Sequence, residues 1–132
     1  MDDKVISVVA ALVRDSAGRV LLVRKRGTLV FMQPGGKRNA GETDVAALSR
    51  EIIEELGCCI YQHSARAIGV FECAAANEPG FTVRAAVYAV EIEGTATPQA
   101  EVEQLVWVDP KAPSDLPFAP LTRDHVLPLA AQ

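Results

Sequence analysis

Residues 43–57 limit what this chain can fold into more than any other stretch, because their pattern predicts one amphipathic helix with defined ends. Thr43 can cap the first turn, Asp44 suits the positive end of the helix dipole, and Gly57 can end the helix in a left-handed conformation. One flank of this helix is apolar and consists of Val45, Leu48, Ile52 and Leu56. A helix with one apolar flank has to bury that flank, so the sequence predicts a packed core beneath it.

Another flank carries three glutamates at i, i+3 and i+4 spacing, which are Glu51, Glu54 and Glu55. Like charges at this spacing destabilise an isolated helix by about 0.2–0.5 kcal/mol per pair. One interpretation is a solvated acidic face that Arg50 partly neutralises. The other is a cation site, because no lysines alternate with the glutamates and the preceding Gly35-Gly36 turn lets bare backbone approach the same flank. Carboxylates beside an exposed carbonyl are the oxygen ligands that Mg²⁺ or Mn²⁺ prefers.

The stretch from Gly36 to Cys58 resembles the Nudix box, whose pattern is G-x5-E-x7-R-E-U-x-E-E-x-G-U with U apolar. All fixed positions match, and they are Gly36, Glu42, Arg50, Glu51, Glu54, Glu55 and Gly57, with Ile52 and Cys58 in the apolar places. So many residues at set offsets are far more specific than a short glycine motif. The chain therefore resembles the MutT-like Nudix hydrolases. This resemblance implies an α/β fold in which a mixed β-sheet lies inside an α/β/α sandwich.

The resemblance also implies an activity, the hydrolysis of a pyrophosphate bond in a nucleoside diphosphate linked to another group. It implies that Mg²⁺ or Mn²⁺ is held by the Gly35 carbonyl and by the carboxylates of Glu51, Glu54 and Glu55. The segment that starts at Glu101 resembles the family's last strand, whose leading acid can reach the metal. Glu101 is therefore a further candidate ligand, with two alternatives: Glu103, or a plain polar start of a strand.

Four residues form the catalytic set that the resemblance implies: Arg50, Glu51, Glu54 and Glu101. Arg50 is expected to hold a glutamate in position through a charge-assisted hydrogen bond, with Glu54 as its local partner. Glu42 is expected to tie the preceding loop to the helix. Glu54 is the first candidate for the general base and Glu101 is the second.

Contacts to the substrate are predicted outside the box. Arg24 begins a basic cluster for which phosphate contact and a solvated strand end carry equal weight, and Lys37 resembles a lysine that is common at this place in the family. Phe31 is a candidate for stacking on a base, as are Phe71 and Phe118, although an isolated aromatic residue usually packs in the core. The short chain favours a nucleoside triphosphate, damaged nucleotides included. ADP-ribose, dinucleoside polyphosphates, sugar nucleotides and a non-catalytic nucleotide sensor stay open as alternatives.

Composition narrows the remaining choices. The 132 residues are 49% hydrophobic with a formal net charge of −4, which predicts one globular domain over residues 1–132 and, without a basic stripe, no binding to nucleic acid. The three cysteines fit small buried hydrophobes in a reducing compartment. The N-terminus lacks the basic start of a secretory signal and the apolar run Val5–Val13 is too short to span a membrane, so a cytoplasmic location is expected. A homodimer is common among similar proteins, and nothing in the sequence demonstrates one.

Hydrophobic patterns outside the box predict strands and one more helix. A first hairpin is expected from Val5–Val13 and Val20–Val23, and a second from Ile60–Cys73 and Phe81–Ile92. A further strand is expected at Glu101–Val108, and a closing helix at Leu121–Ala131 despite Pro128.

Overall fold

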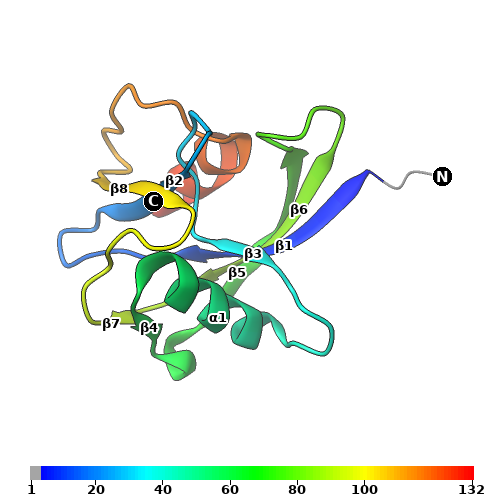
Figure 1. Ribbon diagram of the computed structural model, residues 1–132. Helices are drawn as coiled ribbons and strands as arrows, with labels where there is room; N and C mark the ends of the chain where they lie inside the picture. Colours follow the sequence, from blue (N-terminus) through cyan, green and yellow to red (C-terminus); the bar gives the residue numbers. More distant parts are fainter. Residues whose placement is uncertain (1–3) are drawn as a thin grey trace.

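A mixed four-stranded sheet forms the centre of the structure, a computed structural model that describes residues 4–132 (Figure 1). The strand order is β3–β1–β6–β5, and the strands are β1 (Val5–Leu12), β3 (Gly35–Lys37), β5 (Arg66–Ala74) and β6 (Thr82–Ala89). β1 pairs in parallel with β6, whereas the β1–β3 and β5–β6 pairs are antiparallel. The sheet is therefore mixed, as the sequence predicts.

Two smaller sheets and four helical segments complete the described chain. The paired strands are β2 (Val20–Lys25) with β8 (Val102–Val108), and β4 (Cys59–Ile60) with β7 (Ile92–Glu93). The helices are α1 (Asp44–Leu56), a short 3-10 turn (Gln62–Ser64), a π-helical turn (Thr122–Val126) and α2 (Leu127–Ala130). Among these, no helix has the length and apolar character needed to cross a membrane. Residues 1–3, which entered the argument about a secretory signal, lie outside the described part of the chain.

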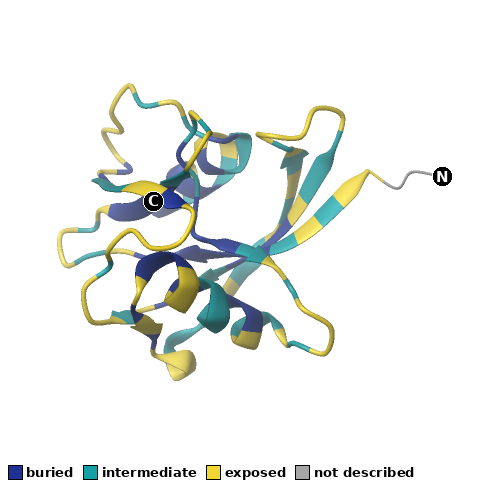
Figure 2. Ribbon diagram, viewed as in Figure 1, coloured by how far each residue is buried: buried dark blue, intermediate teal, exposed yellow. Residues whose placement is uncertain are grey.

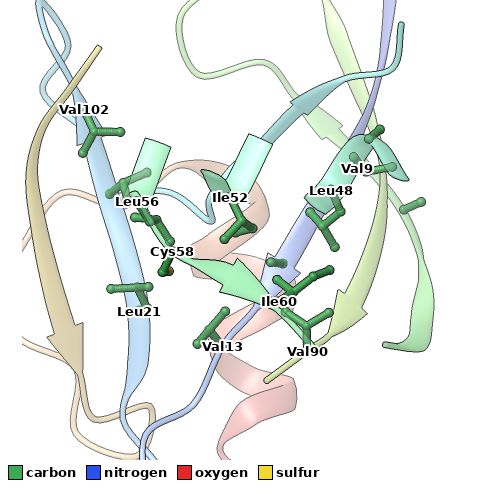
Figure 3. Packing of buried hydrophobic residues seen from close by; sticks show 14 residues of the cluster. Val9, Val13, Leu21, Leu48, Ile52, Leu56, Cys58, Ile60, Val90 and Val102 are labelled. Atoms are coloured by element: carbon green, nitrogen blue, oxygen red, sulfur yellow. The ribbon is translucent and has the colours of Figure 1, made fainter. Parts of the chain in front are cut away.

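β1 separates two hydrophobic clusters, because successive side chains of a strand point to opposite faces. Val9 and Ala11 pack in the cluster that includes α1, whereas Ala10 and Leu12 pack in the cluster that includes Val126 and the other buried residues of the C-terminal helix. Figure 2 shows the buried strands between the helices, and Figure 3 shows the cluster beneath α1. The strands thus lie between a helix on each side, which confirms the α/β/α sandwich.

The ends of α1 agree with the sequence pattern. The Thr43 hydroxyl accepts a hydrogen bond from Ala46 N at 3.1 Å, and Gly57 ends the helix with a left-handed φ of 67°. Leu48, Ile52 and Leu56 are fully buried, and Val45 packs against the same cluster. Local capping and one apolar flank were sufficient to predict this helix.

The first predicted hairpin is wrong. β1 and β2 belong to different sheets, because both edges of β1 are taken by β3 and β6. Only a short contact remains between the two segments, a hydrogen bond from Leu21 N to Val13 O and an isolated bridge between Arg14 and Val20. The second predicted hairpin is confirmed as β5 and β6, although the 3-10 turn separates β5 from β4, and Val90 and Glu91 separate β6 from β7.

Two smaller expectations need adjustment. All three cysteines are free, but only Cys58 is buried, while Cys59 is exposed and Cys73 is half-buried. The C-terminal helix is present, and Pro128 lies in the first turn of α2 directly after the π-helical turn. Pro128 has no N–H group to donate, and it follows the π-helical turn, where the regular hydrogen-bond pattern of the helix is already changed.

Leu48 and Ile53 on α1 offer a matched test of the core. Leu48→Ala is expected to lower the free energy of unfolding by about 2–5 kcal/mol, because the fully buried side chain would leave a cavity. Ile53→Ala on the same helix should change it by less than about 0.5 kcal/mol, since Ile53 is 50% exposed. Urea denaturation measures both values. Equal effects of the two changes would contradict the placement of α1.

Candidate active site

A cleft of about 530 Å³ runs from the carboxylates of α1 along β3 to the β5–β6 turn and the start of the C-terminal helix. One end is polar and is lined by Lys25, Gly35–Lys37, Arg50, Glu51, Glu54, Glu55 and Glu101. Apolar side chains also line the cleft, among them Ile6, Val8, Val83 and Leu121, and Val8 lies directly opposite Lys37 in the β1–β3 pair. A concave site with these dimensions and this mixture of polar and apolar walls is typical of small-molecule binding.

Two glycines bring the backbone of β3 against α1 and β1. Gly35 has a φ of 149°, and a Cβ atom there would lie 2.1 Å from the carbonyl oxygen of Val9. A Cβ atom on Gly36 would lie 2.5 Å from Oε2 of Glu51. Gly35 therefore requires glycine, since any side chain would push β3 away from β1, whereas a side chain at Gly36 would displace the Glu51 carboxylate.

Arg50 connects the loop, the helix and β3 through five hydrogen bonds. Its guanidinium donates to both carboxylate oxygens of Glu42 at 2.7 and 2.9 Å, to Glu51 at 3.0 Å, to Glu54 at 3.1 Å and to the carbonyl of Lys37 at 3.0 Å. The predicted contact with Glu54 is present, but the two-pronged contact is with Glu42. These bonds raise the pKa of Arg50, and the hydrogen bond from Arg50 lowers the pKa of Glu42 to about 2.

Glu55 is the most buried of the three helix carboxylates. Burial raises its pKa to about 7, against the opposing influence of the Lys25 ammonium at 3.4 Å and of the Gly35 N–H, which donates to it at 3.1 Å. Sequence reasoning included Lys25 in the basic cluster that begins at Arg24 but missed its ion pair with Glu55. Strand alternation could have found it, because Lys25 follows Arg24 in β2 and therefore points to the opposite face.

The three helix carboxylates are already paired with the basic side chains of Arg50 and Lys25. Among residues 4–132, no group of three or more His, Cys, Asp or Glu side chains is arranged so that it could hold a metal ion as it stands. The donor set nevertheless suits a hard divalent cation, since Glu51, Glu54 and Glu55 and the backbone of Gly35 line the same end of the cleft and offer only oxygen ligands. Glu51 and Glu54 would have to turn from Arg50 toward the cation, and Arg50 would keep its contact with Glu42.

Glu101 lines the cleft at the entrance to β8. Its carbonyl accepts a hydrogen bond from Arg26 N at 2.7 Å, and the preceding Ala100 has a left-handed φ of 52°. The alternative acid, Glu103, instead forms an ion pair with Arg26 at 3.5 Å. Of the two acids, Glu101 is the one that lines the cleft.

Only some of the residues that were predicted to contact the substrate lie in the cleft. Lys37 lines the cleft, but Arg24 lies outside it and donates to the carbonyl of Thr28 at 3.1 Å. Phe31 is 3% exposed and packs in the core, as the structural alternative in the sequence analysis had it. Phe71 stacks on His125 with 4.9 Å between ring centroids, outside the cleft. No stacking role for these aromatic residues follows from the geometry.

Known proteins resemble this chain in sequence and in fold. A sequence model of the NUDIX domain matches residues 4–129. The chain belongs to the Nudix family. One curated relative is the 8-oxo-dGTP diphosphatase of Haemophilus influenzae, which is 43% identical over 61 residues. That match covers 43% of this chain and 45% of the relative, so it spans less than half of either protein.

Solved structures share the fold over most of the chain. The MutT NUDIX hydrolase from Burkholderia pseudomallei superposes with a TM-score of 0.77 at 24% identity, covering 98% of this chain and 97% of that one. The E. coli ORF135 protein superposes with a TM-score of 0.72 at 27% identity, covering 96% of this chain and 86% of that one. These similarities confirm the Nudix fold.

The ion pair between Arg50 and Glu42 predicts how stability depends on pH. The folded-state pKa of Glu42, about 2, is below its ordinary value of 4.5, so its contribution to stability is complete above pH 4.5 and is lost as the pH falls toward 2. The difference in free energy of unfolding between the wild type and Glu42→Gln should therefore shrink over this pH range. Urea denaturation at several pH values measures it, with Glu72→Gln as an exposed control. A difference that is independent of pH would contradict the ion-pair assignment.

Proposed function

We propose that this Nudix protein hydrolyses the pyrophosphate bond of nucleoside triphosphates, damaged nucleotides included, with Mg²⁺ or Mn²⁺ as cofactor. The observation that carries the proposal is the polar end of the cleft, where three helix carboxylates face the glycine backbone of β3 beside Lys25, Lys37 and Arg50. Carboxylates can hold the cations, and the basic side chains can meet phosphate oxygens. Incubation with a panel of nucleotides and Mg²⁺, scored for released phosphate and pyrophosphate, tests the reaction and identifies the substrate.

Each residue at this end has a chemical task in the proposal. Glu51, Glu54, Glu55 and the Gly35 carbonyl would hold the cation, with Glu101 as a further ligand. Divalent cations supply charge neutralisation on the phosphate oxygens and make a bound water more acidic. Lys37 lies at the end of β3, where its ammonium can contact the phosphate chain. Arg50 acts as a positioning residue, because its contact with Glu42 keeps the loop and the helix together.

Glu54 remains the first candidate for the general base. Its side chain is 53% exposed, so it can reach a water in the cleft, whereas Glu51 is 15% exposed and lies against Gly36. Glu55 is held by Lys25 and the Gly35 N–H and is better suited as a ligand. Glu101, which also lines the cleft, remains the second candidate.

The size of the cleft and one relative favour a single nucleotide as the substrate. A volume of about 530 Å³ suits one base, one sugar and a short phosphate chain, and the matched relative from Haemophilus influenzae is an 8-oxo-dGTP diphosphatase. ADP-ribose, dinucleoside polyphosphates and sugar nucleotides carry a second large group and are the alternatives that the panel tests. A non-catalytic nucleotide sensor is less consistent with the complete set Arg50, Glu51, Glu54 and Glu55. A single domain over residues 1–132, a cytoplasmic location and a homodimer stay predictions.

Replacing carboxylates tests the catalytic assignment. Glu54→Gln and Glu51→Gln should each lower kcat at least about 100-fold, because an amide keeps the size but loses the negative charge that holds the cation or accepts a proton. Glu72→Gln on β5, whose carboxylate pairs with Arg84 on the sheet, should keep the full rate. Phosphate release in millimolar Mg²⁺ measures all three. Unchanged turnover of Glu54→Gln, with intact folding by circular dichroism, would remove the proposed mechanism.

Metal binding can be tested without turnover. The three carboxylates repel one another, so Mg²⁺ or Mn²⁺ should stabilise the folded state, by about 2.7 kcal/mol at a concentration 100 times the Kd. Differential scanning fluorimetry should show a rise in Tm of several degrees in the wild type and a much smaller rise in Glu51→Gln. A flat response of the wild type across millimolar metal would favour the purely structural acidic helix.

A further inference from the structure

Gln33 lies in the wall of the cleft with one end of its side-chain amide unpaired. The side chain is 5% exposed, and its carbonyl oxygen Oε1 accepts a hydrogen bond at 2.9 Å from the hydroxyl of Thr122, which is fully buried. Among residues 4–132, Nε2 of Gln33 is a buried side-chain nitrogen without any hydrogen-bond partner. A buried donor without a partner is costly, because it has lost its contact with water and gained nothing in exchange.

The surroundings of Gln33 hold this amide in place. Met32 exchanges both backbone hydrogen bonds with Val23 at 2.8 Å, and the carbonyl of Pro34 accepts from Ala11 N at 2.9 Å. The backbone on both sides of Gln33 is therefore fixed to neighbouring strands. Because Thr122 occupies the carbonyl end of the amide, the NH₂ end is the one left to meet a ligand.

The position of Gln33 along the cleft indicates which part of a nucleotide it would meet. Gly35 and Lys37, at the polar end, follow Gln33 in the chain, and two residues of extended backbone span about 7 Å. The cleft also contains the apolar side chains of Met32, next to Gln33, and Leu121, next to Thr122, which suit a flat base and not a phosphate. A nucleotide whose phosphates lie at Gly35–Lys37 would thus bring its base toward the amide.

We propose that Gln33, oriented by Thr122, determines base specificity by donating a hydrogen bond from Nε2 to a carbonyl oxygen of the base. Guanine and uracil carry a carbonyl where adenine and cytosine carry an amino group. An amino group facing Nε2 would leave two donors opposed and unpaired, so the site selects against such bases. The inference rests on the proposed function, since it assumes that the cleft holds a nucleotide with its phosphates at the polar end.

Removing both members of the pair separates a role in specificity from a role in stability. The double variant Gln33→Met, Thr122→Val keeps the approximate size of both side chains and leaves no polar group of either residue unpaired. In the absence of ligand it should be about as stable as the wild type, because replacing both partners by apolar groups is close to neutral. The ratio of kcat/KM for GTP over ATP, and for UTP over CTP, should nevertheless fall about tenfold or more.

The single variants and a matched control complete the design. Gln33→Met alone should lower both ratios, and Thr122→Val should lower them less, because it frees the amide to turn without removing it. Gln62→Met makes the same substitution at an exposed glutamine in the 3-10 turn, outside the cleft, and should leave rates, ratios and Tm unchanged. If the double variant does not fold, the two single variants carry the test.

Equilibrium binding of GMP and AMP, measured by calorimetry, distinguishes failure of this inference from failure of the proposed function. If the wild type prefers GMP and the Gln33 variants lose that preference, the inference stands even when no nucleotide is hydrolysed. Unchanged ratios and unchanged binding preferences in folded Gln33 variants would overturn it. A wild type that prefers adenine and cytosine nucleotides would overturn it as well, and so would a double variant that loses stability while keeping its specificity.

Discussion

The interaction between Arg50 and its oxygen partners is the one on which the rest of the site depends. A single guanidinium reaches Glu42 in the loop, Glu51 and Glu54 on α1, and the carbonyl of Lys37 on β3. Without this positive charge, carboxylates one turn apart on the helix would repel one another and the loop would lose its attachment. Charge-assisted hydrogen bonds from the planar guanidinium of arginine also fix the orientation of the carboxylates, which the point charge of a lysine would not do.

This hydrogen-bond network forms only because the backbone of β3 comes close enough to α1 to take part in it. Gly35 and Gly36 allow that approach, against Val9 O on one side and the Glu51 carboxylate on the other. β1 in turn supports β3, and its second half, from Val9 to Leu12, is buried on both faces between the two helical layers. The position of the charged groups is therefore set by the packing of apolar residues in the middle layer. A cavity beneath α1 would shift the helix and displace its carboxylates in the site, because a densely packed interior transmits such a shift to its neighbours.

Sequence information was sufficient where the determining contacts are local. The cap of Thr43, the left-handed Gly57 and the apolar flank of α1 lie within one element, so their pattern could be read directly. The first hairpin was wrong because neighbouring segments in the chain, β1 and β2, pair instead with β6 and β8 far along the sequence. Lys25 was missed as the partner of Glu55 for a related reason, since 30 residues of sequence separate two side chains that meet only after the sheet has formed. The pair formed by Gln33 and Thr122 lies even farther apart, with a sequence separation of 89 residues.

The two ends of the cleft illustrate different ways of keeping polar groups ready for a ligand. At the carboxylate end, Arg50 and Lys25 supply positive charge that a cation would replace in part, so these side chains are satisfied before anything binds. At Gln33, the NH₂ group has no such substitute and is left unpaired. When a cation replaces Arg50 or Lys25 as the partner of a carboxylate, one charge interaction is exchanged for a similar one. Binding at the carboxylate end is therefore a balance, and the charge and geometry of the ligand decide whether it is favourable. An unpaired donor makes binding at the second end a net gain for a ligand with an acceptor, and this asymmetry is what allows one amide to discriminate between bases.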